Sequence, residues 1–178
     1  MLRYYYFYKD MVINVHIDGA SRNNPGNAGA GVVIEAGAGV VLAELKEYLG
    51  IATNNEAEYR ALIIALNYLN KVSKKFRITV PAPASSARSG AQTAISGDIN
   101  KITFFSDSQL LIKQMNGEYA VKSPKILPLY ADAKKILKSM GLTVGSAHPG
   151  YSFIYIPREF NKQADRLANL AIDEALAL

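Results

Sequence analysis

The sequence predicts an α/β sandwich in which helices pack on a mixed β-sheet. The first half of the chain reads as three strands and a helix, and the second half as strands mixed with helices, an order typical of mixed sheets. The chain has 178 residues, of which 49% are hydrophobic and 20% charged. This length and composition favour a single domain with a sizeable core and exclude a wholly disordered chain.

The first three predicted elements are strands. Alternating apolar residues predict a strand over 12–18 that ends at Asp18. A turn rich in Asn, Pro and Gly follows this strand. Two further strands, 28–36 and 39–48, are joined by Gly37-Ala38-Gly39, which favours a hairpin.

A helix is expected next, from Asn55 to about Val72, because apolar residues recur there at helical spacing. The spacing of Asn55 and Glu58 suits a helix cap and places Glu58 in the first turn. Residues 81–100 differ in composition, since 13 of these 20 residues are Ala, Ser, Gly or Pro. We expect a flexible insertion loop at 81–100, preceded by a short strand at 78–80.

The carboxyl-terminal half alternates strands and helices. The expected elements are a strand at 102–105, a helix from Asp107 to Met115, a helix between Ser123 and Met140, a strand at 152–156 and a final helix at 161–178. We expect all of residues 1–178 to form one domain, with residues 1–10 as an amino-terminal extension.

Composition excludes several classes of site and of protein. The chain has no cysteine and two histidines, which excludes disulfides, thiolate zinc sites, a cysteine nucleophile and a histidine-rich metal site. A bound metal would need carboxylate ligands, which favour a hard cation such as Mg²⁺ or Mn²⁺. Neither a signal peptide nor an apolar run long enough to span a bilayer is visible. We therefore expect a cytoplasmic, monomeric protein with no membrane partner.

Positive charge is concentrated in one region. The formal net charge is +5, and residues 111–140 contain six lysines but two acidic residues. Such a bias suits a polyanionic partner, although a solvated helix face explains the charge equally well.

Four acidic residues stand at the ends of predicted elements, namely Asp18, Glu58, Asp107 and Asp165. Each alone has a structural explanation as a turn former, a helix cap or a partner of the helix dipole. Carboxylates that converge at one end of a sheet repel each other, and a cation relieves that repulsion. Oxygen ligands suit Mg²⁺ or Mn²⁺, and two such ions can support phosphodiester cleavage.

Four segments, in order, resemble the signature blocks of type 1 ribonuclease H. They are Ile17-Asp-Gly-Ala-Ser-Arg-Asn-Asn-Pro-Gly26, Thr53-Asn-Asn-Glu-Ala-Glu-Tyr59, Ser106-Asp-Ser-Gln109 and Ile156-Pro-Arg-Glu-Phe-Asn-Lys-Gln-Ala-Asp-Arg-Leu-Ala168. The stretch that begins at Asp107 is similar to archaeal-type members. The resemblance spans residues 12–178 apart from 81–100.

The resemblance implies a three-layer sandwich with a five-stranded mixed sheet flanked by helices. It also implies an endonuclease that cuts the RNA strand of RNA–DNA hybrids with two Mg²⁺ or Mn²⁺ ions, leaving 5′-phosphate and 3′-hydroxyl ends. The implied metal ligands and catalytic acids are Asp18, Glu58, Asp107 and Asp165. The implied substrate contacts are Asn24, Asn54, Asn55 and Gln109 on the minor groove and Thr53 on a DNA-strand phosphate.

Three positions need separate interpretation. The family pattern Thr-Asn-Asn-x-x-Glu selects Glu58 over Glu56 as the second acid. Arg158 occupies a position that the family uses near the scissile phosphate, and a salt bridge to Glu159 or another surface acid is the alternative. His16 shares strand parity with Asp18, which leaves a place near the site open, but we expect a packed or capped histidine there. We expect His148 to lie in a loop.

The segment 116–124 is too short for the basic protrusion that some relatives carry between two helices, so we expect affinity for nucleic acid to depend on Lys113, Lys122 and Lys125. Two other functions remain open. One is a broader nuclease that also cuts double-stranded RNA, because that duplex too carries 2′-hydroxyls. The other is a non-catalytic nucleic-acid-binding domain, which would be marked by loss of a carboxylate; all four are present. Integrases and junction resolvases share the sheet and the acidic site, but the Thr-Asn-Asn block argues against them.

Overall fold

The computed structural model describes residues 3–73, 77–81, 92–145 and 150–177. The strands in these ranges are β1 (Arg3–Arg22), β2 (Gly26–Ala36), β3 (Val40–Ala52), β4 (Arg77–Pro81), β5 (Gln92–Ser106), β6 (Thr143–Val144) and β7 (Gly150–Tyr155). The α-helices are α1 (Asn54–Ser73), α2 (Gln109–Met115), α3 (Ile126–Ser139) and α4 (Lys162–Leu176), with 3₁₀ turns at Gly37–Gly39 and Arg158–Phe160.

The sheet is mixed, as predicted. Its order is β3-β2-β1-β5-β7-β6, and β4 pairs with β5 at one end. Strands β1, β2 and β3 form an antiparallel meander, whereas β1, β5 and β7 run parallel. The first five strands of this order are the expected five-stranded mixed sheet. The pair of residues in β6 is an addition that the sequence does not predict, because two residues carry no periodicity.

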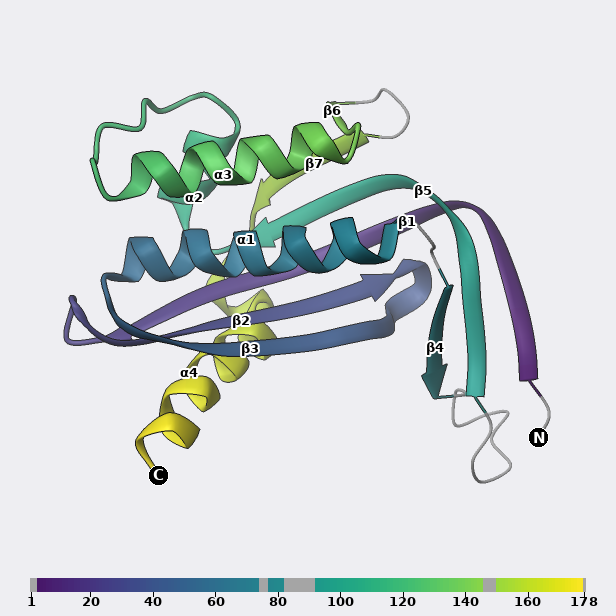
Figure 1. Ribbon diagram of the computed structural model, residues 1–178, viewed down its shortest axis with the longest axis horizontal. Coiled ribbons are helices and arrows are strands. Elements are labelled where there is room, and N and C mark those ends of the chain that lie inside the picture. Colours follow the sequence, from purple (N-terminus) through teal and green to yellow (C-terminus); the bar gives the residue numbers. More distant parts are fainter. Residues whose placement is uncertain (1–2, 74–76, 82–91, 146–149, 178) are drawn as a thin grey trace.

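Helices cover both faces of the sheet and so make three layers (Figure 1). Helices α1 and α3 lie on one face, and α4 lies on the other, against β2 and β3. A Cβ atom at Gly31 of β2 would lie 2.1 Å from the carbonyl oxygen of Ala164. Glycine at this position therefore allows α4 to pack directly on the backbone of the sheet.

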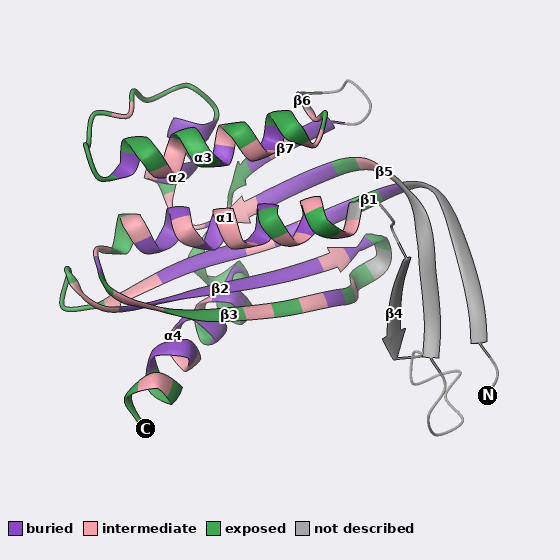
Figure 2. Cartoon of the chain, viewed as in Figure 1, coloured by how far each residue is buried: buried purple, intermediate pink, exposed green. Residues whose placement is uncertain are grey.

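The core follows from this layering. Strand β2 is buried on both faces, so the run Val32-Val33-Ile34 is buried without alternation. In β1, by contrast, Ile13, Val15 and Ile17 are fully buried at every second position. Figure 2 shows the buried residues concentrated where the sheet meets α1 and α4.

Two segments depart from the sequence-based expectation. The prediction of a flexible loop over 81–100 is wrong for 92–100, which belong to β5, while residues 82–91 lie outside the described residues. Residues 3–10 are not a separate extension but the start of β1. Residues 3–8 pair in parallel with residues 92–97 of β5, and these ends bend away from the helices together with β4 (Figure 1).

Candidate active site

The four predicted acidic residues line one pocket of about 320 Å³. Asp18 lies on β1, Asp107 directly follows β5, Glu58 is in α1 and Asp165 is in the first turn of α4. The parallel pairing of β1 and β5 ends at His16 and Phe105, so both strands deliver their acid to the same edge of the sheet. Asn54 and Arg158 line the same pocket.

A glycine brings Glu58 close to Asp18. A Cβ atom at Gly19 would lie 2.1 Å from the backbone nitrogen of Glu58, so any side chain there would push α1 off the sheet. Asp18 is thus one acid of the pocket, and Gly19 leaves the space that Glu58 needs beside it. This close approach is a packing reason for the glycine in the first signature block.

The start of α1 differs from the prediction in a way that matters for the site. Thr53, rather than Asn55, caps the helix: its Oγ1 accepts from the Glu56 backbone N–H at 3.3 Å, and its own N–H donates to Glu56 Oε2 at 2.9 Å. The Thr53 hydroxyl also donates to Glu56 Oε2 at 2.6 Å, and this bond, together with the one from the Thr53 N–H, lowers the pKa of Glu56. Because Glu56 supplies the cap, the Glu58 side chain is not needed there and lies in the pocket.

Burial and mutual repulsion dominate the electrostatics of Asp18. The residue is 5% exposed. Burial raises the pKa of Asp18 to about 7, and the charges of Asp107 and Asp165 act in the same direction, whereas Arg158 opposes them. A hydrogen bond with the Asp107 carboxyl group also raises the pKa of Asp18.

Glu58 is the most deeply enclosed of these acids. It is 4% exposed, and burial raises its pKa well above the usual range, with added repulsion from Asp18 and Asp107. The Gly19 N–H and the Ser106 hydroxyl hydrogen-bond to Glu58 and partly offset this shift. Its Oε2 atom is buried without a hydrogen-bond partner among the described residues. A buried acceptor of this kind is suited to a cation.

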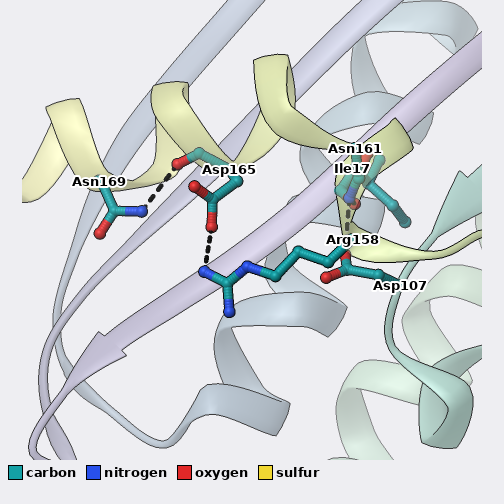
Figure 3. A network of polar contacts seen from close by, with 6 residues as sticks. All are labelled: Ile17, Asp107, Arg158, Asn161, Asp165 and Asn169. Carbon is teal, nitrogen blue, oxygen red and sulfur yellow. Dashed lines mark hydrogen bonds and ion pairs between the residues drawn. The ribbon is translucent and has the colours of Figure 1, made fainter.

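Asp107 is held by an amide that the sequence did not single out. Nδ2 of Asn161 donates to Asp107 Oδ1 at 2.7 Å and to the Ile17 carbonyl oxygen at 2.9 Å (Figure 3). Asn161 is 1% exposed and immediately precedes α4. One side chain therefore ties the end of α4 to Asp107 and to the residue before Asp18. Its position four residues before Asp165 in the last signature block is the signal that could have identified it.

Asp165 points to Arg158 (Figure 3). The guanidinium group of Arg158 forms an ion pair with Asp165 Oδ1, and the Arg158 side chain is 74% exposed. The sequence left open a salt bridge from Arg158 to Glu159 or another surface acid. Arg158 does form a salt bridge, and the acid is Asp165 of the pocket. This pairing raises the pKa of Arg158.

His16 does not line this pocket. His16 stacks on Phe105, with ring centroids 4.9 Å apart, and burial lowers its pKa, although Glu35 and Asn161 oppose that shift. The expectation that His16 is packed is confirmed. His148 lies outside the described residues.

The oxygen donors of this pocket fit a hard divalent cation chemically, and the unpartnered Glu58 oxygen points to the same chemistry. As they lie, however, no three acidic or histidine side chains in the described ranges are close enough together to enclose an ion. The ion pair with Arg158 is made through one carboxylate oxygen of Asp165, Oδ1.

Comparisons with known proteins agree with the blocks and the fold. A family model described as RNase H matches residues 10–83, and one described as reverse transcriptase-like matches residues 82–171. Ribonuclease HI of Halobacterium salinarum is 32% identical over 92% of this chain and 65% of its own length. The crystal structure of RNase H1 from that archaeon has a TM-score of 0.70 at 31% identity, covering 92% of this chain and 98% of that one.

The chain belongs to the type 1 ribonuclease H family. A further member, LC11-RNase H1 in complex with an RNA/DNA hybrid, has a TM-score of 0.70 at 35% identity and covers 94% of this chain and 99% of its own. The bifunctional protein of Mycobacterium tuberculosis is 36% identical over 93% of this chain, which spans 36% of that relative's length. Among the helices in the described ranges, none is both long and apolar enough to cross a membrane.

The residues that the ribonuclease H resemblance assigns to substrate lie on two sides of the pocket. Asn24 Oδ1 accepts from the Asn54 backbone N–H at 2.9 Å, which joins the β1–β2 turn to the start of α1. Thr53 caps α1, and Asn55 is exposed in its first turn. Gln109, at the start of α2, does not line the acidic pocket but a neighbouring one.

Proposed function

We propose that this chain is a metal-dependent endonuclease that hydrolyses the RNA strand of RNA–DNA hybrids, leaving 5′-phosphate and 3′-hydroxyl ends. The observation that carries this proposal is a pair of buried carboxyl groups, Asp18 and Glu58, that face an open pocket with two more acids and a buried oxygen lacking a partner. Such an arrangement is unfavourable without a cation. Membership of the ribonuclease H family, and a relative solved with an RNA/DNA hybrid, support the substrate class.

Asp18, Glu58, Asp107 and Asp165 would hold two Mg²⁺ or Mn²⁺ ions in the presence of substrate. When bound, such ions activate a water for in-line attack and stabilise the leaving oxygen. Asn161 keeps the Asp107 carboxylate oriented toward the pocket through its 2.7 Å hydrogen bond. No covalent enzyme intermediate is needed, because the attacking group in such a hydrolysis is a water molecule.

Arg158 acts on the substrate phosphate. In the absence of substrate its guanidinium group pairs with Asp165, but most of the side chain is exposed and free to reorient. Turned toward the substrate, the guanidinium group would hold a phosphate oxygen and stabilise charge on it as the ester bond breaks. Arginine remains protonated near neutral pH and so cannot serve as the general base.

The amides around the pocket recognise the RNA strand. A 2′-hydroxyl both donates and accepts hydrogen bonds, and the side-chain amides of Asn24, Asn54, Asn55 and Gln109 can do either. The hydrogen bond between Asn24 and Asn54 places two of these residues at one edge of the acidic pocket. We assign Thr53, at the start of α1, to a phosphate of the DNA strand.

The test is a cleavage assay on end-labelled RNA–DNA, RNA–RNA and DNA–DNA duplexes with Mg²⁺, Mn²⁺ or EDTA. We expect cleavage of the RNA strand of the hybrid, dependence on the divalent ion and products with 5′-phosphate ends. Cleavage of double-stranded RNA at a similar rate would identify a broader nuclease. Hybrid binding without cleavage of any duplex would identify a non-catalytic nucleic-acid-binding domain, and full activity in EDTA would contradict the metal-dependent mechanism.

A further inference from the structure

A second pocket, the α2–β7 pocket, lies beside the acidic one, and of its lining residues only Gln109 has a part in the proposed function. Its volume is about 360 Å³, and its lining comes from α2 and the residues after it and from the end of β7. This size lies in the range of pockets that hold small organic ligands. Figure 1 shows α2 and β7 next to each other at the edge of the sheet away from β3.

The two pockets are neighbours along two chain segments. At the start of α2, Ser108 lines the acidic pocket and Gln109 lines the α2–β7 pocket. After β7 the order is similar, because Tyr155 lines the α2–β7 pocket and Arg158 lines the acidic one. A strand that crosses the acidic pocket therefore meets the α2–β7 pocket within a few nucleotides.

The lining combines an aromatic surface with hydrogen-bonding groups of both kinds. Tyr155 and Ile154 are each 43% exposed, so both leave apolar surface open to solvent at the end of β7. Gln109 and Asn116 contribute amides, and Asn116 Nδ2 donates to the Phe153 carbonyl oxygen at 3.3 Å. Figure 2 shows exposed residues at the end of β7 that faces α2.

The charged side chains suit a nucleotide whose base lies inside the α2–β7 pocket. Lys113 Nζ lies 4.8 Å from the centre of the Tyr119 ring and donates to the Tyr119 hydroxyl at 3.2 Å, which holds the cation at the rim of the pocket. Glu118 lies within the lining, where its carboxylate would repel a phosphate but could accept a hydrogen bond from a base. A base stacked on Tyr155, with its phosphate near Lys113 and its hydrogen-bond donors near Glu118, suits both charged side chains.

We propose that the α2–β7 pocket binds one unpaired nucleotide of the RNA strand, next to the duplex segment held over the acidic pocket. This inference rests on the proposed function, since it assumes that a hybrid crosses the acidic pocket. The RNA strand is the occupant because Gln109, at the boundary of the two pockets, is assigned to that strand. The enzyme then prefers hybrids that continue into single-stranded RNA over hybrids with blunt ends.

The experiment measures binding of fluorescein-labelled hybrids by anisotropy, with the full chain carrying Asp107→Asn so that the substrate survives. The probes are a blunt hybrid and the same hybrid with a short overhang on the 5′ or 3′ end of the RNA or of the DNA. We expect one RNA overhang to tighten binding by roughly 5- to 150-fold, the range for stacking one base on an aromatic side chain.

Adding Tyr155→Ala should remove this gain and leave the affinity for the blunt hybrid unchanged. Tyr155→Leu, which keeps apolar volume, should do the same and guards against a folding defect, which circular dichroism would detect. Tyr48→Ala is the matched control, because Tyr48 is also an exposed tyrosine but lies on β3. Tyr48→Ala should still bind the hybrid with the RNA overhang more tightly than the blunt hybrid.

Equal affinity for blunt and overhanging hybrids would overturn the inference, and so would an equal gain from a DNA overhang or a gain that survives Tyr155→Ala. Failure of the chain with Asp107→Asn alone to bind even the blunt hybrid would instead contradict the proposed function.

Discussion

The two ends of α4 carry acidic residues in opposite settings. At its carboxyl-terminal end, Asp173 pairs with Arg22 of β1 and Glu174 pairs with Lys46 of β3, and both acids are more than half exposed. At its amino-terminal end, Asp165 joins a pocket in which Asp18 and Glu58 are buried with raised pKa values. Both ends have acids near cations, but only one has acids removed from water. Burial, rather than the number of charges, therefore separates the candidate active site from an ordinary surface.

The largest effect should come from neutralising a buried acid. Asp18→Asn keeps the shape of the side chain but removes a metal ligand, so hybrid cleavage should fall by at least ~100-fold, the upper end of the range for groups one step removed from a metal. The melting temperature in EDTA should be unchanged or higher, because repulsion with Asp107 and Asp165 is relieved. Near-normal cleavage by this variant would remove Asp18 from the site.

Arg158→Ala should lower kcat by roughly 10- to 1,000-fold, the range for losing one donor to a developing charge, and should change KM less. Arg158→Lys should restore part of kcat, as a point charge without the bidentate geometry. Because the Arg158 side chain is mostly exposed, the melting temperature should hardly change. If Arg158→Ala turns over at the normal rate, the ion pair with Asp165 is its whole role.

Asn161→Ala should weaken Mn²⁺ binding, measured by calorimetry, by roughly 10- to 100-fold, because Asp107 loses the amide that orients it. The matched control is Gln163→Ala on the same helix, where the lost hydrogen bond is to the exposed Glu44. This control should bind Mn²⁺ normally. A lower melting temperature with unchanged Mn²⁺ affinity in Asn161→Ala would show that the amide supports the fold alone.

The pH dependence of stability should distinguish the two ends of α4. In the folded state the pKa of Asp18 is raised from 3.8 to about 7, so between these values the folded chain holds a proton that the unfolded chain has released. Raising the pH through this window in EDTA should lower the free energy of unfolding, by up to about 1.4 kcal/mol per pH unit.

The free energy of unfolding can be measured by urea titration at each pH. For Asp18→Asn it should depend less on pH than for the wild type. Mg²⁺ should reduce the loss of stability of the wild type at higher pH, because the ion favours the ionised acids. Identical pH profiles for the two proteins would contradict the raised pKa.

The smallest effect should come from the surface pairs. Asp173→Asn removes an exposed ion pair, so the free energy of unfolding should change by less than ~1 kcal/mol. The difference from the wild type should shrink further at high salt, and hybrid cleavage should be unaffected. A change in cleavage as large as that from Asp18→Asn would mean that the two ends of α4 are not independent.

Sequence reasoning succeeds where the signal is local. Alternation predicts the central strands, and the position of Asp18 and Asp107 at strand ends predicts that they meet, because parallel strands end at one edge. That the four acids line one pocket follows the sequence prediction, and their role as metal ligands stays a prediction. The cap of α1 was misassigned because Thr53 and Asn55 both suit a cap, and the hydrogen bonds of Glu56 decide between them.

Other features depend on partners far along the chain. Residues 92–97 are poor in apolar side chains and read as a loop, yet they are strand because residues 3–8 pair with them. The role of Asn161 likewise needs Ile17 and Asp107 to be neighbours, which no periodicity near Asn161 reveals. Local composition cannot report such contacts.

The parallel pairing of β1 with β5 has a consequence for how this chain folds. The β1–β2–β3 meander joins strands that are adjacent in the sequence. The central pair of β1 and β5, by contrast, brings Val15 next to Phe104, far along the chain. Asp165 is farther still, in α4. Contacts between such distant segments form slowly and late in folding. A chain emerging from the ribosome therefore has no assembled acidic pocket until α4 docks. The proposed nuclease activity in this sense requires α4, and a chain made only as far as β7 does not yet have the pocket.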